Sequence, residues 1–91
     1  MAKQIYDFYS DPGHGWLKVS RDELKELGLT ETITSFSYQR GKDVYLEEDC
    51  DASAFFKAKQ EKQGITIKFR DHYAGERVSK IRNYMRYVAI Y

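Results

Sequence analysis

The chain has 91 residues, of which 42% are hydrophobic and 32% are charged, and its formal net charge is +1. This length supports one hydrophobic core, so a second domain is excluded and residues 1–91 are expected to form a single domain. The composition excludes an intrinsically disordered chain, and the longest uncharged stretch, residues 32–39, is too short to cross a bilayer as a helix.

Two strands are predicted at the start of the chain. Residues 3–9 (KQIYDFY) are rich in aromatic and β-branched residues and end at a turn-forming cluster, residues 10–13 (SDPG). Residues 14–19 resume an extended pattern that places Trp16 and Leu17 on opposite faces. We expect the two strands to pair antiparallel.

A first helix is predicted over residues 21–27. Ser20 and Glu23 have the spacing of a capping box, in which each side chain satisfies a free backbone N–H of the other residue. Gly28 is suited to the left-handed conformation that ends a helix.

A second helix is predicted over residues 52–63, with Asp49 or Asp51 as its N-cap and Gly64 as its end. Three apolar residues form the stripe expected to face the core: Ala54, Phe55 and Ala58.

Further strands are predicted on both sides of this helix. Residues 32–38 and 43–48 flank a polar, glycine-containing loop, residues 39–42, and predict a hairpin. Residues 65–69 alternate regularly and predict a strand, followed by a loop over residues 71–76. Three side chains of that strand are expected to face the core: Ile65, Ile67 and Phe69.

The C-terminal residues 77–91 fit two patterns. Their apolar residues have helical spacing, whereas the β-branched and aromatic residues near the end suit an edge strand. Both forms stay open for this segment.

These elements predict an α+β fold with the chain order ββαββαβ. We expect a small two-layer domain whose antiparallel sheet carries both helices on one face, with a basic, aromatic tail at the C-terminus.

The loop from Asp11 to Trp16 is the first candidate site. Gly13 and Gly15 allow close approach of a ligand to the backbone, and His14 can exchange a proton near neutral pH. A tight turn with Trp16 anchored in the core explains the same residue types, and we favour that interpretation.

The sequence gives no sign of a metal or cofactor site. His14, His72, Cys50 and the acidic residues 47–51 lack the spacing of known metal motifs, and no phosphate-binding or dinucleotide motif is present. A single cysteine cannot form an internal disulfide, and no apolar leader follows the N-terminus, so a reducing cytoplasm is expected.

Charge is unevenly distributed along the chain. Residues 1–50 carry six Lys/Arg and ten Asp/Glu, whereas residues 51–91 carry nine and four. The basic residues of the last third alternate with aromatic ones and could hold phosphates and stack on bases. Tyr and Arg are also common anchors of protein interfaces, and the two halves of the chain could instead pair with each other.

Four segments, in this order, resemble a family of short, uncharacterised proteins encoded by bacteriophages, prophages and plasmids. The segments are DPGHGWL, SYQRG, YLEEDCD and SKIRNY, and the resemblance extends from about Tyr6 to Tyr87. It implies a bacterial cytoplasm and an accessory gene of a mobile element. It implies no catalytic or binding residue, because no activity is established for the family.

We therefore expect a cytoplasmic, non-enzymatic binding module that modulates or inhibits a host or defence protein. The alternative is a nucleic-acid or nucleotide binder that uses the basic, aromatic C-terminal segment and the hairpin containing Arg40. An enzyme that uses His14 with a carboxylate is the least favoured function, because no orienting partner is evident. Homo-oligomerisation stays open, and no membrane partner is expected.

The candidate binding residues combine a special loop or a basic segment with stacking or hydrogen-bonding side chains. They are His14, Trp16, Tyr38, Arg40, Arg82 and Tyr84.

Overall fold

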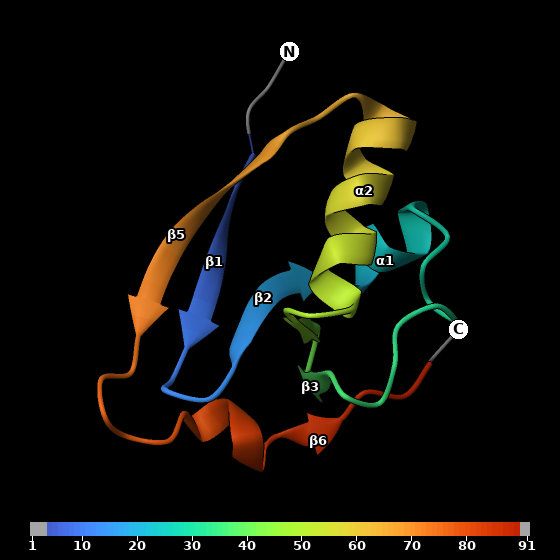
Figure 1. The fold of residues 1–91 in the computed structure, drawn as a ribbon. Coiled ribbons are helices and arrows are strands. Elements are labelled where there is room, and N and C mark those ends of the chain that lie inside the picture. The colour runs from blue at the N-terminus through green and yellow to red at the C-terminus, as the bar shows by residue number, and fades with distance from the viewer. Residues whose placement is uncertain (1–3, 90–91) are drawn as a thin grey trace.

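A computed structural model describes residues 4–89 of the chain (Figure 1). The elements in chain order are β1 (Gln4–Ser10), β2 (Gly15–Ser20), α1 (Arg21–Glu26), β3 (Tyr38–Arg40), β4 (Asp43–Glu47), α2 (Asp51–Gln63), β5 (Ile67–Tyr73), the 3-10 helix η1 (Lys80–Asn83) and β6 (Met85–Arg86). The strands form one six-stranded sheet in the order β5-β1-β2-β4-β3-β6. The fold is α+β.

The sheet is mixed, so the prediction of an antiparallel sheet is wrong. β1 pairs antiparallel with β2, but it pairs parallel with β5 along its whole length, from Gln4 opposite Ile67 to Ser10 opposite Tyr73. α2 connects β4 to β5. A strand that joins a sheet in parallel orientation needs a long crossover connection of this kind, because a tight turn produces only antiparallel pairs. The alternation of residues within a strand shows which side chains share a face, but it does not identify the neighbouring strand.

Both predicted helices are present. The hydroxyl of Ser20 accepts a hydrogen bond from the N–H of Glu23 at 3.1 Å, and Gly28 adopts a left-handed φ of 71° after α1. α2 ends at Gly64, whose φ is 65°. The predicted N-cap of α2 is wrong, because Cys50 occupies that position without a side-chain hydrogen bond and Asp51 is the first helical residue.

Residues 32–37 form turns instead of the predicted strand, and β3 begins only at Tyr38. Asp51 explains the difference. Its carboxylate, which is 3% exposed, accepts hydrogen bonds from the N–H of Thr34 at 3.1 Å and from the hydroxyls of Thr34 and Ser37. These contacts fold the segment over the start of α2 and keep it out of the sheet.

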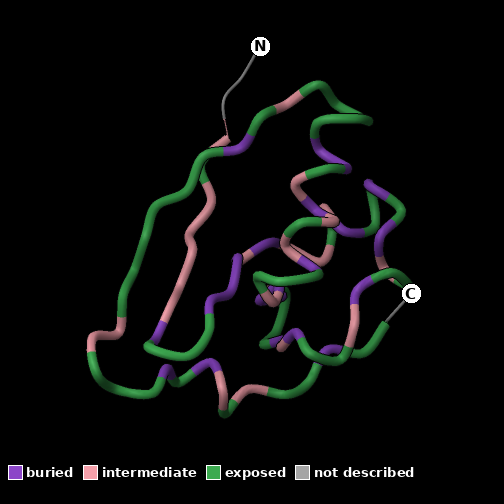
Figure 2. Tube along the Cα trace, viewed as in Figure 1, coloured by how far each residue is buried: buried purple, intermediate pink, exposed green. Residues whose placement is uncertain are grey.

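β5 begins two residues later than predicted and extends into the segment expected to be a loop. Ile67 is 3% exposed, and the register places Phe69 on the same face as Ile67, as predicted, but Phe69 is 52% exposed and is not buried in the core. Within residues 4–89, β5 is an edge strand that pairs with β1 alone, and Figure 2 shows it exposed along most of its length. Phe69 instead packs edge-on against Phe8, with the ring centres 6.0 Å apart.

The C-terminal segment is neither one helix nor one long strand. η1 forms a single short turn in which Ile81 is buried, and the two residues of β6 pair with β3. Tyr87 is buried and its hydroxyl donates to the carbonyl of Thr30 at 2.6 Å. Residues 90 and 91 lie outside the described residues, so the prediction for the last two residues of this segment is not tested.

The core has one cluster on each face of the sheet. The larger cluster joins the helices to the strands, with Leu17 and Val44 beneath Leu24 of α1 and Phe55 of α2. The smaller cluster lies on the other face, where Trp16, Tyr45 and Ile81 are buried and three partly buried tyrosines pack against them. The helices therefore cover one face, as predicted, and the C-terminal segment crosses the other.

Candidate binding groove

The candidate site lies on the sheet face opposite the helices. The register places Tyr9 of β1 beside Trp16 of β2 on one side and beside His72 of β5 on the other. Tyr38 of β3 lies opposite Tyr45 of β4. Because paired residues project to the same side of a sheet, these rings form one aromatic surface.

Asp11 fixes the C-terminal segment over this surface. Its carboxylate accepts hydrogen bonds from the Nε and Nη2 atoms of Arg82 at 2.7 and 2.9 Å and from the N–H of Ser79 at 2.9 Å. The N–H groups of Gly13 and His14 donate to it at 3.0 Å. The Arg82 guanidinium and these N–H groups hold the pKa of the Asp11 carboxyl well below its usual range.

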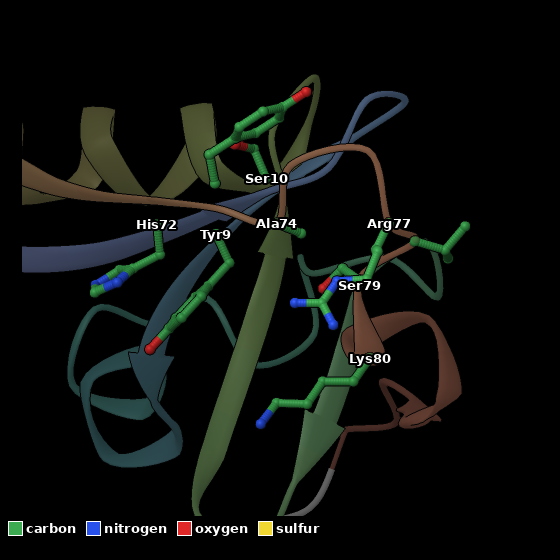
Figure 3. A pocket seen from close by; sticks show the side chains of 9 residues that line it. Tyr9, Ser10, His72, Ala74, Arg77, Ser79 and Lys80 are labelled. Carbon is green, nitrogen blue, oxygen red and sulfur yellow. The ribbon is translucent and has the colours of Figure 1, made fainter.

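The first cleft, which we call the His72 cleft, lies between β1, β5 and the C-terminal segment and has a volume of about 400 Å³. Figure 3 shows Arg77 and Lys80 extending from the C-terminal segment towards the side on which Tyr9 and His72 lie. The His72 ring stacks on Tyr9 with a centre-to-centre distance of 4.7 Å, and its Nε2 lies 2.9 Å from the Asp7 carboxylate. The lining contains three basic side chains and no Asp or Glu.

The second cleft, the Arg40 cleft, has a volume of about 250 Å³. Its basic side chains are Lys18, Arg40 and Lys80, and again no Asp or Glu lines it. The Arg40 guanidinium lies over the Tyr84 ring, 5.3 Å from its centre. Burial raises the pKa of Tyr45 to about 12.

The two clefts adjoin each other, because Tyr9, Ser79 and Lys80 line both of them. We call the two clefts together the basic groove. Five basic side chains border it, and they come from β2, β3, β5 and the C-terminal segment: Lys18, Arg40, His72, Arg77 and Lys80.

A third cleft of about 410 Å³, the Trp16 cleft, holds the other predicted residues. His14, Trp16, Tyr38 and Arg82 line it together with Phe36 and Arg86, but Glu47 and Asp49 line it too. Arg82 is bound to Asp11 and lies over Trp16, 5.5 Å from the ring centre. The charges in this cleft are therefore mixed, and part of its basic surface already has a partner.

The six candidate residues thus divide between two places. Arg40 and Tyr84 belong to the basic groove, and the other four belong to the Trp16 cleft. Sequence reasoning missed Tyr9, Lys18 and His72 as groove residues, because the pairing of β5 with β1 creates the site and the sequence does not show that pairing. The basic, aromatic pattern of the C-terminal third did indicate Arg77 and Lys80.

Comparison with protein-family models, with curated proteins and with solved structures gives no match. The resemblance to a phage-encoded family therefore stays a prediction. Within residues 4–89, no helix has the length and apolar character needed to span a membrane, and no cluster of three or more His, Cys, Asp or Glu side chains could hold a metal ion.

Proposed function

We propose that the protein binds nucleic acid, with the phosphates held in the basic groove. The acid-free lining of the groove supports this proposal most strongly, because four Lys and Arg side chains and His72 line it in a chain whose net charge, with histidine neutral, is only +1. Phosphate contacts by Lys and Arg supply most of the affinity of nucleic-acid binding.

The charged and aromatic side chains of the groove favour a nucleic acid over other acidic ligands. Arg77 and Lys80 are exposed, and neither forms an ion pair among the described residues. They are therefore available to a ligand without the loss of an existing contact. Tyrosines line the same two clefts, as expected of a surface that contacts both phosphates and bases.

The function that the sequence favoured, modulation or inhibition of a host or defence protein, stays a prediction and has less support. That function calls for a contiguous exposed aromatic patch in the C-terminal third. There, Tyr73 is 65% exposed, but Tyr84 is partly buried and Tyr87 is 4% exposed. The predicted cytoplasmic, mobile-element setting is compatible with a nucleic-acid ligand and stays part of the proposal.

The salt dependence of binding tests the proposal. If the groove neutralises about four phosphates, the affinity for a fluorescein-labelled oligonucleotide falls about 50-fold between about 50 and 200 mM salt, because bound counterions are released. Arg77→Gln/Lys80→Gln should weaken binding at low salt and reduce the salt slope by about 1 to 2.

The matched control is Lys25→Gln/Lys57→Gln, which removes the same charge from exposed positions on the two helices. It should leave both affinity and slope close to those of the unsubstituted protein. A flat salt response, or an equal loss in the two double variants, contradicts phosphate binding in the groove.

A further inference from the structure

We infer that the basic groove binds an unpaired polynucleotide strand and not a duplex. This inference rests on the proposed function and adds the form of the ligand. Three features of the groove support it: its rings, the elements on its face, and the acidic side chains at its border.

The rings of the groove are suited to stacking on free bases. Tyr9 and His72 line the His72 cleft, and Tyr45 and Tyr84 line the Arg40 cleft. The side chain of His72 is 41% exposed and stacks on Tyr9, whereas Tyr73 follows His72 in β5 and projects to the other face of the sheet. Bases inside a duplex are covered by their neighbours, whereas unpaired bases can stack on aromatic side chains.

The groove face offers no helix to a duplex. Readout of a duplex commonly places a helix or a two-stranded ribbon in the major groove. Here α1 and α2 pack on the other face of the sheet, and the groove face carries only the four-residue η1. The clefts are instead hollows of about 400 and 250 Å³, close to the lower end of the size range of sites for single small-molecule ligands.

Acidic side chains border the groove. Asp7 lies beside His72 and Arg70, and Asp43 lies 3.8 Å from Lys18. A duplex wide enough to cover both clefts would bring phosphates against these carboxylates. A single strand can follow the acid-free lining between them.

The test compares a short, labelled homopyrimidine strand with a hairpin duplex of the same length in fluorescence anisotropy at low salt. The strand is made both as RNA and as DNA, so that the two sources of unpaired polynucleotide are distinguished. We expect the preferred strand to bind at least about tenfold more tightly than the duplex.

Tyr84→Leu removes a partly buried ring that lines the Arg40 cleft and should weaken strand binding about tenfold, while weak binding of the duplex stays unchanged. Phe36→Leu, at a residue that is 63% exposed and lies outside the groove, is the control and should change neither. Equal affinity for strand and duplex, or an unchanged strand affinity in Tyr84→Leu, overturns the inference and leaves the proposed function standing. Failure of both ligands to bind overturns the proposed function itself.

Discussion

Asp11→Ala is expected to lower the free energy of unfolding by about 3 kcal/mol. Asp11 is 5% exposed and is the shared acceptor for Arg82, Ser79, Gly13 and His14. Its removal leaves a guanidinium and three backbone N–H groups without their partner. It also frees the C-terminal segment that carries Arg77 and Lys80, so binding should fall together with stability.

The stabilisation by Asp11 depends on pH in a defined direction. The pKa of its carboxyl is lower in the folded protein than in the unfolded chain, where aspartate titrates near about 3.9. The ionised Asp11 carboxylate therefore contributes its full stabilisation at pH values above the pKa of the unfolded chain, and this stabilisation is lost as the pH falls below that pKa. The difference in stability between the unsubstituted protein and Asp11→Ala should shrink by about 1 kcal/mol between about pH 7 and pH 3.

Urea denaturation followed by circular dichroism at the two pH values measures both effects. Glu31→Gln is the control, because Glu31 is an exposed carboxylate, and it should change stability by less than about 0.5 kcal/mol. A loss of stability in Asp11→Ala that is no larger than in this control would show that Asp11 does not hold the segment.

Phe55→Ala should destabilise the fold by about 3 to 5 kcal/mol. Phe55 is 0% exposed and lies at the centre of the helix-side core, with its ring edge-on to Tyr6 at 5.4 Å. The substitution leaves a cavity between α2 and the sheet. Domains of this size are commonly stable by only about 5 to 15 kcal/mol, so the loss is a large part of the total.

The denaturation midpoint in urea, compared among three variants, measures this effect. Phe55→Leu fills most of the cavity and should cost less than about 1.5 kcal/mol. Phe36→Ala removes the same ring from a position that is 63% exposed and should have little effect. Similar midpoints for Phe55→Ala and Phe36→Ala would contradict the position assigned to Phe55 in the core.

Local signals in the sequence predicted the helices well. The start of α1 and the end of α2 are encoded by residues a few positions apart, namely Ser20 with Glu23 and the glycine at position 64. Such contacts form within a single turn of chain, so they can be recognised without knowledge of the tertiary fold.

Contacts between distant residues were not predictable in the same way. Asp51 holds Thr34 and Ser37 in turns, and this overrides the strand pattern of that segment. β5 pairs with β1 across most of the chain length, and that pairing places His72 beside Tyr9. The position of β5 at the edge of the sheet leaves Phe69 exposed. The basic groove depends on both β5 and the C-terminal segment, so the sequence indicated its basic residues without indicating their assembly.

The most direct test of nucleic-acid binding in the basic groove is a ¹H–¹⁵N NMR titration with a short oligonucleotide. If the groove binds the oligonucleotide, the largest chemical-shift changes occur in the amides of the residues that line it, and α1 and α2 are little affected. The lining residues to be followed are Tyr9, Lys18, Arg40, His72, Arg77 and Lys80. Changes centred on the helices or on the apolar cleft around Phe8, Phe56 and Phe69 would contradict binding in the groove.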